Sequence, residues 1–388
     1  MSVILAHRDN GQFSSIKSLK FNQKIVDRRV RVMEGEIMTQ AIDESSLSAG
    51  ILQIVDQAKQ SRKVGVGGFK FTERELGYVN QVIASSHLSY GPMSQTFETR
   101  IAKAHGCKYG LFMNSGTSAL HVALAALKIV YGWNDGDEVI VPATTFVATI
   151  NVVLHNNLTP VFVDVDPDTF AMDPSKIEEV ITSKSRCILP VHLLGLPSDM
   201  EPIMDIANEY NLRVVEDSCE TMFAEYKGKP VGSFGDVACF STYVAHFLVT
   251  GVGGLAITND SHLNGVMRSL MNHGRDIAYT SIMDDDDLTE DELQSVVAAR
   301  FRFMHLGHSF RATELEAAIG LGQLDNVDQI LSSRKSNAVY LTTRLEELDD
   351  YLSLPKTPSD RSHSFMLYGI KTKREGIGSN SYSSTHNP

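Results

Sequence analysis

The sequence predicts an α/β protein built on a mostly parallel sheet that helices cover. Between about residues 108 and 260, short apolar runs typical of strands alternate with longer segments whose apolar residues recur at helical spacing. Polar blocks containing glycine or acidic residues follow three of these runs, at residues 114–120, 216–220 and 241–254. Because ligands of open parallel sheets bind beyond the carboxyl ends of the strands, these blocks also indicate where a site would lie.

The alternation predicts the elements in order. The expected strands cover residues 109–113, 138–141, 160–165, 187–192, 213–216 and 237–243. The expected helices cover residues 118–130, 146–155 and 200–210, with a longer helical region at 315–348. The acidic run at 284–287 is expected to be a solvated loop leading into a helix, since the spacing and the glycine of a calcium loop are absent.

The chain of 388 residues is long enough for one large domain with a smaller one attached. We expect an N-terminal extension with one helix at residues 1–65, a large domain at 66–330, and a shortened small domain at 331–388. The end of this last segment is rich in Ser, Gly and Asn and is expected to be disordered.

Composition and charge narrow the class of protein. A net charge of −12 argues against a general nucleic-acid binder, because neutralising phosphates requires a basic face. Neither a signal peptide nor an apolar run approaching the ~20 residues of a membrane span is visible. We therefore expect a cytoplasmic protein with no nucleic-acid or membrane partner.

No metal site is expected. The four cysteines lie far apart and form no CxxC pair. His305 and His308 have the spacing HxxH, but no acidic partner follows at the distance found in zinc proteases.

Gly116, Thr117 and Ser118 stand where an expected strand gives way to a helix. Backbone N–H groups and hydroxyls at the positive end of a helix dipole form a cradle for phosphate. The alternative is an ordinary N-cap, because Thr and Ser favour that position in any helix.

Asp217 and His246 are the candidate reactive side chains. Asp217 ends an expected strand, where it either binds a ligand or simply faces water. A lone histidine is more often structural, but His246 lies between the expected strand at 237–243 and a glycine turn at 251–254. Ser241, five residues earlier, can add a hydroxyl to a phosphate site.

The three blocks resemble the cofactor site of the pyridoxal-phosphate sugar aminotransferases of the DegT/DnrJ/EryC1 family. The resemblance covers roughly residues 66–330 and includes further motifs at 88–98, 137–148, 191–195, 307–311 and 317–320. It implies the type I fold of pyridoxal-phosphate enzymes, aspartate-aminotransferase-like, with a truncated small C-terminal domain. It also implies pyridoxal 5'-phosphate or pyridoxamine 5'-phosphate as cofactor, and a homodimer with shared active sites.

The resemblance assigns roles to individual residues. Asp217 would pair with the protonated ring nitrogen of the cofactor, and Phe146 would stack on the ring, although a buried aromatic at a helix start explains Phe146 equally well. The loop before Arg311 would reach the cofactor phosphate of the neighbouring subunit. The implied cofactor-binding residues are Gly116, Thr117, Ser118, Phe146, Asp217, Glu220, Ser241, Ser309 and Arg311.

His246 is the main departure from the family pattern, because it occupies the position of the lysine that binds the cofactor covalently. An imidazole cannot form that bond. Val252 replaces the usual glutamate of the glycine turn, Ser309 replaces an asparagine, and Glu220 stands where glutamine or histidine is common.

A histidine at position 246 resembles a minority branch of the family, the 3-dehydratases of nucleotide-linked 4-keto-6-deoxy sugars. We therefore expect 3-dehydration of such a sugar with His246 as catalytic base and glutamate as amino donor. One alternative is a sugar aminotransferase of the same family, which the missing lysine argues against. The other is a catalytically inactive homologue that binds cofactor or sugar.

Overall fold

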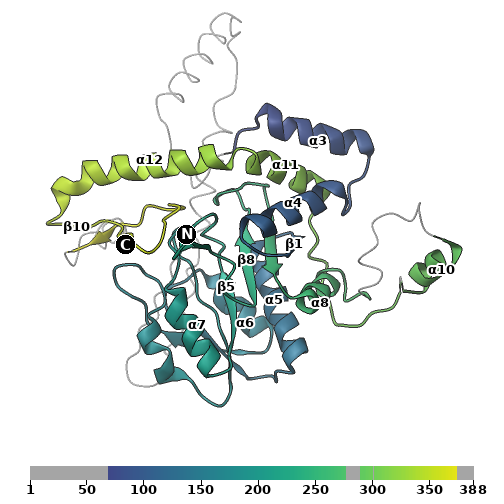
Figure 1. The fold of residues 1–388 in the computed structure, drawn as a ribbon, viewed down its shortest axis with the longest axis horizontal. Coiled ribbons are helices and arrows are strands. Elements are labelled where there is room, and N and C mark those ends of the chain that lie inside the picture. Colours follow the sequence, from purple (N-terminus) through teal and green to yellow (C-terminus); the bar gives the residue numbers. More distant parts are fainter. Residues whose placement is uncertain (1–68, 277–288, 300, 374–388) are drawn as a thin grey trace, which may run out of the picture. The chain divides into compact units, whose positions relative to one another are not determined.

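The structure is a computed structural model that describes residues 69–276, 289–299 and 301–373 (Figure 1). The expected N-terminal extension with its helix, the run of four aspartates at 284–287 and the expected tail after residue 373 lie outside the described residues. The helix expected after the acidic run is α10, Glu290–Ala299.

A seven-stranded sheet with the order β1-β9-β8-β5-β4-β2-β3 forms the centre of the fold. Neighbouring strands run parallel except around β9, which pairs antiparallel with both β1 and β8. The prediction of a mostly parallel sheet is therefore confirmed. The strands are β1 Tyr109–Met113, β2 Glu138–Pro142, β3 Thr159–Val163, β4 Ser185–Ile188, β5 Arg213–Asp217, β8 Val237–Ser241 and β9 Gly254–Thr258.

One face of the sheet packs against α5 (Gly116–Tyr131), α6 (Val147–His155) and α8 (Ser261–Met271). The apolar side of α5 is almost fully buried at the middle of this layer. The alternation of side chains along each strand sends every second residue into this core and the others into the opposite one.

The opposite face packs against α4 (Pro92–Ala104), α7 (Met200–Glu209) and α11 (Glu314–Leu324). In turn α11 packs against α3 (Glu73–Ser85), which Figure 1 shows beside it. The fold thus has three layers, with the sheet between two sets of helices.

The helical region expected at 315–348 consists of two helices and a short turn of 3-10 helix. A capping box at Thr313 starts α11, and α12 (Val327–Leu345) follows after a two-residue break. The domain boundary expected at residue 330 falls inside α12, which is continuous there. That boundary stays a prediction. The short elements are η1 Pro174–Lys176, η2 Glu178–Val180, η3 Glu346–Leu348, β6 Glu225–Tyr226, β7 Lys229–Pro230, β10 Leu352–Ser353 and β11 Lys371–Thr372.

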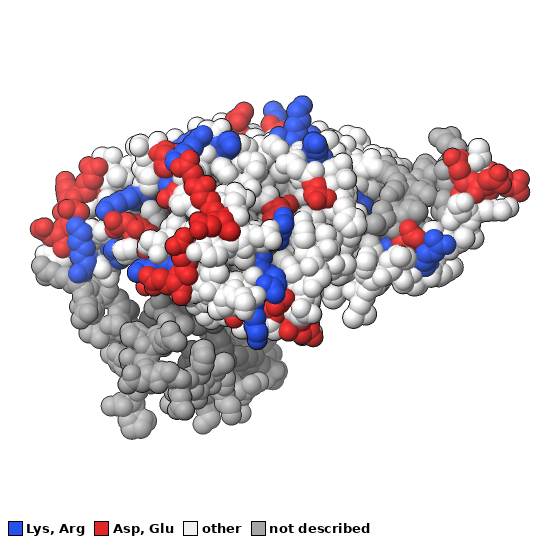
Figure 2. Space-filling model, turned by 60° about the horizontal axis from the view of Figure 1, so that its bottom comes forward, with Lys and Arg blue, Asp and Glu red and all other residues white. Residues whose placement is uncertain are grey.

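The surface carries charges of both signs. Figure 2 shows Lys and Arg side chains interspersed with Asp and Glu over the described residues of one face. Within the described ranges, none of the helices combines the length and the apolar character needed to cross a membrane.

Candidate active site

The predicted polar blocks meet at one edge of the sheet. Because β1, β8, β5, β4 and β2 are mutually parallel, their carboxyl ends lie along the same edge, and antiparallel β9 begins there. Asp217 is the last residue of β5, Ser241 is the last of β8, and Gly116 opens α5 just after β1. The topology therefore brings Gly116 to the same edge as Asp217 and Ser241, which lie more than a hundred residues later in the sequence.

The N-terminus of α5 is packed closely against the ends of these strands. A Cβ atom on Gly116 would lie 2.7 Å from Cys219 Sγ and 2.9 Å from Ser241 Cβ, so only glycine fits. Ser115 caps the helix by accepting a hydrogen bond from the Ser118 N–H at 3.0 Å. Among the described residues, nothing accepts the N–H groups of Gly116 and Thr117, which remain available to an anion.

Ser118 has a different environment from the one predicted. Its side chain is buried, and its hydroxyl donates to Asn114 Oδ1 at 2.7 Å and accepts from the Ser115 hydroxyl at 2.9 Å. The hydroxyl thus helps to shape the turn before α5, and its role as a phosphate ligand stays a prediction.

Asp217 is buried and is held by two donors. Thr149 Oγ1 donates to Asp217 Oδ2 at 2.8 Å, and the Cys219 N–H donates to Oδ1 at 3.2 Å. Burial raises the pKa of Asp217, and these two hydrogen bonds lower it only in part. No lysine or arginine in the described part of the chain pairs with this carboxyl group. A ligand with a protonated ring nitrogen would supply the missing positive charge.

Thr149 was not predicted from the sequence. It lies on α6, one turn after Phe146, whose half-exposed ring stands at the start of that helix. The hydroxyl of Thr149 also bonds to Thr145 Oγ1 at 2.8 Å. A polar residue on the otherwise apolar buried side of this helix was the available signal.

Glu220 lies three residues beyond Asp217 and accepts the Leu194 N–H at 2.9 Å. Burial raises the pKa of Glu220, and the nearby charge of Asp217 acts in the same direction, whereas the Leu194 hydrogen bond opposes them. Two buried acids with raised pKa values at one edge of the sheet are typical of a functional site.

His246 lies in the loop between β8 and β9. Hydrogen bonds between Thr242 and Gly253, and between Thr242 and Thr250, close this loop. Burial lowers the pKa of His246 to about 4, whereas the backbone of Cys219 raises it and the charge of Arg334 lowers it further. The ring is therefore neutral at physiological pH. Its buried Nδ1 has no hydrogen-bond partner in the described part of the chain.

Ser309 and Arg311 lie beside the end of β1, where the Asn114 N–H donates to Phe310 O at 2.8 Å. The exposed Arg311 guanidinium bonds to Ser309 Oγ and to His273 Nε2, each at 3.1 Å. It makes no ion pair with any described carboxylate, so it is available to an anion. The structure shows no contact between this pair and Asp217 or His246 within the described residues.

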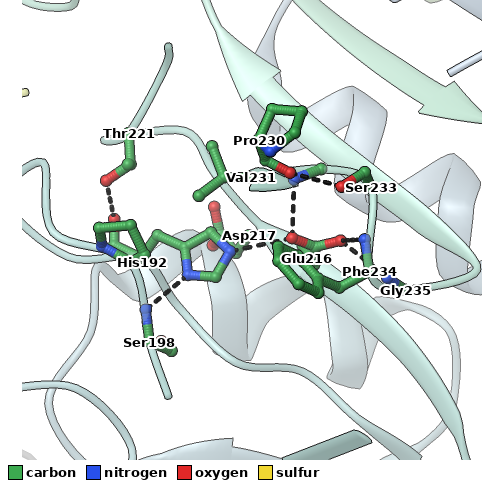
Figure 3. Close-up of polar contacts among 12 residues, drawn as sticks. His192, Ser198, Glu216, Asp217, Thr221, Pro230, Val231, Ser233, Phe234 and Gly235 are labelled. Carbon is green, nitrogen blue, oxygen red and sulfur yellow. Dashed lines mark hydrogen bonds and ion pairs between the residues drawn. The ribbon is translucent and has the colours of Figure 1, made fainter. Parts of the chain in front are cut away.

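Glu216, the residue before Asp217, belongs to a hydrogen-bonded cluster whose polar contacts Figure 3 shows. This Glu216 cluster consists of His192, Ser198, Glu216, Gly232, Phe234 and Gly235. Glu216 accepts the N–H groups of Gly232, Phe234 and Gly235 at 2.7–2.8 Å. His192 Nδ1 accepts the Ser198 N–H at 2.9 Å, so its Nε2 carries the proton and donates to Glu216 Oε2 at 3.1 Å. The cluster anchors β5 and therefore the position of Asp217.

The donors and acceptors at this edge suit a flat, phosphate-bearing ligand whose ring nitrogen is protonated. The first N–H groups of α5, which no described residue accepts, and the Ser241 hydroxyl suit the phosphate, and the buried acid Asp217 suits the ring nitrogen. His246 contributes a neutral imidazole and no amine. For metals, no group of three or more His, Cys, Asp or Glu side chains in the described ranges is arranged to hold an ion.

Known proteins are similar to this chain in sequence and in fold. The pattern that defines the DegT/DnrJ/EryC1/StrS aminotransferase family matches residues 70–381. The GDP-perosamine synthase of Caulobacter vibrioides is 35% identical over 322 residues, which cover 81% of this chain and 80% of that protein.

Two solved structures show the same relationship. An aminotransferase from Psychrobacter cryohalolentis is 33% identical with a TM-score of 0.70, covering 78% of this chain and 76% of its own. The GDP-4-keto-6-deoxy-D-mannose-3-dehydratase of E. coli, solved with hydrated pyridoxal phosphate, is 26% identical with a TM-score of 0.71, covering 81% and 80%. The prediction of a type I fold is confirmed, and pyridoxal or pyridoxamine phosphate is the cofactor of this family.

Proposed function

The chain belongs to the DegT/DnrJ/EryC1/StrS aminotransferase family, and from this premise we propose that it removes the C3 hydroxyl of a nucleotide-linked 4-keto-6-deoxy sugar. The enzyme class is that of sugar-modifying proteins that depend on pyridoxal phosphate. The single observation that favours dehydration is His246, a neutral imidazole at the family's lysine position.

The residues at the carboxyl edge of the sheet have separate tasks in this proposal. The N–H groups of Gly116 and Thr117 and the hydroxyl of Ser241 bind the cofactor phosphate, and Asp217 keeps the ring nitrogen protonated. Held there as its amine, the cofactor would supply the electron sink that loss of the C3 hydroxyl requires. A low pKa leaves His246 unprotonated at neutral pH, which is the state a general base requires.

A second candidate is transamination of the same class of sugar. The names of the curated relatives favour it, because GDP-perosamine synthases are 35% identical to this chain whereas the dehydratase is 26% identical. The absence of a lysine at position 246 argues against it, since proton transfer in transamination is normally the task of that amine. An inactive binding homologue is the third candidate.

One experiment separates the three candidates. Absorbance spectra of the protein with pyridoxal phosphate, before and after addition of glutamate, show whether the cofactor binds without a borohydride-trappable bond and becomes the amine. His246→Lys serves as the control that regains a trappable bond. The protein is then incubated with GDP-4-keto-6-deoxymannose and the product is analysed by mass spectrometry.

A product that lacks one oxygen and contains no new nitrogen supports dehydration. An amino sugar would support transamination and overturn our proposal. If neither wild type nor His246→Lys binds the cofactor, the inactive homologue is the correct description.

We also propose that the enzyme is a homodimer in which Arg311 completes the phosphate site of the partner subunit. The guanidinium of Arg311 makes no ion pair with a carboxylate of the described residues, and apolar side chains on the preceding segment are exposed, including Phe301, Met304 and Leu306. Sedimentation measures the assembly. Mixing Arg311→Ala chains with His246→Asn chains should restore activity in hybrids, and unrestored activity in hybrids of proven dimers would contradict shared sites.

A further inference from the structure

Arg334 on α12 joins three segments that are far apart in sequence. Its guanidinium donates to the backbone carbonyl of His246 at 3.2 Å. It also donates to the carbonyl oxygens of Phe365 at 3.2 Å and Met366 at 3.0 Å. The same guanidinium lies over the ring of Phe247, with 4.6 Å between its central carbon and the ring centroid. The His246 loop is thus attached to the C-terminal segment through one side chain.

The charge of Arg334 is not neutralised by any described carboxylate, because all its polar contacts in the described residues are with backbone carbonyls. Burial lowers the pKa of this guanidinium, which nevertheless stays charged in proteins. A half-buried positive charge without a carboxylate partner is costly unless a specific geometry requires it. Its position beside the His246 loop supplies such a requirement.

The C-terminal segment that Arg334 binds is itself fixed to the other side of the site. The Ser364 N–H donates to Gly195 O at 2.9 Å, and the Leu367 N–H donates to Leu194 O at 3.2 Å. Gly195 has a φ of +104°, and a Cβ there would lie 2.7 Å from the Phe365 and Met366 nitrogens. Because the Leu194 N–H donates to Glu220, the segment spans from the Glu220 side of the site to the His246 side.

We propose that Arg334 is a positioning residue of the active site, which holds His246 in place by tying its loop to the segment at 363–367. The inference rests on the proposed role of His246 as base. The positive charge of Arg334 has a second effect: it lowers the pKa of His246, because a nearby cation disfavours a protonated imidazole.

The groups that face the His246 ring come from three elements. Among the described residues they are the backbone of Cys219 after β5, the ring of Tyr243 in the same loop, and Arg334 on α12. Arg334 is the charged group among them. Burial is the main cause that lowers the pKa of His246 to about 4, so removing the charge of Arg334 should raise this pKa only slightly.

The test measures this pKa directly in the full-length protein. Histidine ring carbons are labelled with ¹³C, and the His246 signal is assigned by its loss in His246→Asn. The signal is then titrated in wild type, Arg334→Gln and Arg334→Lys. Arg344→Gln is the matched control, because Arg344 lies exposed on the same helix over the ring of Tyr340.

Arg334→Gln should raise the His246 pKa, and kcat should fall roughly 10-fold with a change in cofactor affinity of less than about 3-fold. Arg344→Gln should change neither quantity. A His246 signal with wild-type chemical shift, line width and pKa in folded Arg334→Gln overturns the proposal, whatever the reaction proves to be. If the pKa moves while no keto-sugar is converted, the placement of His246 is upheld and the proposed function has failed.

Arg334→Lys gives a second test should Arg334→Gln not fold. The lysine keeps the charge, so the His246 pKa should stay close to the wild-type value. A single ammonium cannot reach three carbonyls as the planar guanidinium does, so kcat should still fall roughly 10-fold at every pH. Wild-type turnover in this variant would contradict a positioning role.

Discussion

The Glu216 cluster and the group formed by Asp217, Glu220 and His246 are neighbours with opposite properties. In the cluster, both carboxylate oxygens and both ring nitrogens have partners, and although burial opposes it, the bonds from His192 and the glycine N–H groups lower the pKa of Glu216. In the second group, burial raises the pKa values of two acids, and His246 Nδ1 has no hydrogen-bond partner among the residues that the structure describes. A buried polar group with complete bonding stabilises a fold, whereas incomplete bonding leaves capacity for a ligand.

The largest effect is expected from breaking the cluster. Glu216→Ala leaves three backbone N–H groups and His192 without their acceptor, so unfolding free energy should fall by about 3–5 kcal/mol. Urea denaturation measures the loss. Asp217→Asn, at the following residue, is the matched control and should change the free energy of unfolding by less than about 1 kcal/mol. Equal losses in the two variants would remove the distinction drawn between the two regions.

The same Asp217→Asn variant, which should hardly change stability, should have a large effect on turnover. An amide cannot keep the ring nitrogen of the cofactor protonated, so kcat should fall by about 100-fold or more. Single-turnover conversion of the cofactor by glutamate, followed by absorbance, measures this step. Retention of more than about half of the wild-type rate would mean that Asp217 is only structural.

A third buried group, His105, should make the stability of the protein depend on pH. This side chain is fully buried, its Nδ1 donates to Val231 O at 2.8 Å, and burial lowers its pKa to about 4 from 6.5. The pKa of His105 is lower in the folded than in the unfolded protein. Its contribution to the free energy of unfolding is therefore fully present above pH 6.5 and is lost as the pH falls toward 4.

His105→Gln does not titrate in this range, so its stability should fall less steeply between these two pH values. The difference between wild type and variant should reach the order of 2 kcal/mol. Thermal unfolding at a series of pH values measures it. Parallel curves for the two proteins would show that His105 is not the group that titrates.

The smallest effect is expected at Thr149. Thr149→Val keeps the shape of the side chain but removes the hydroxyl that donates to Asp217, which should cost about 1 kcal/mol of stability. Cofactor affinity should fall a few-fold because the carboxylate is less firmly held. Titration of the apoprotein with pyridoxal phosphate, followed by fluorescence, gives the affinity. An affinity equal to wild type would show that the Thr149 hydroxyl does not help Asp217 to bind the cofactor.

Much of the fold was predictable because its signals are local. The strands at β1, β2, β5 and β8 and the helices α5 and α7 were located within a few residues from hydrophobic periodicity alone. Strand β9 was not predicted, since five buried residues directly after a glycine turn have no period that distinguishes them. The break between α11 and α12 was also missed, because both flanks have helical composition.

The sequence by itself determined which chemical groups are present: an acid at a strand end, a glycine that fits a close approach, and an imidazole where the family has an amine. Only the tertiary structure decided their neighbours. Ser118 turns inward to Asn114, Thr149 reaches Asp217 across 68 residues, and Arg334 reaches His246 across 88. The physical reason is that residue type and periodicity are local properties, whereas hydrogen-bond partners and burial follow from the order of strands in the sheet.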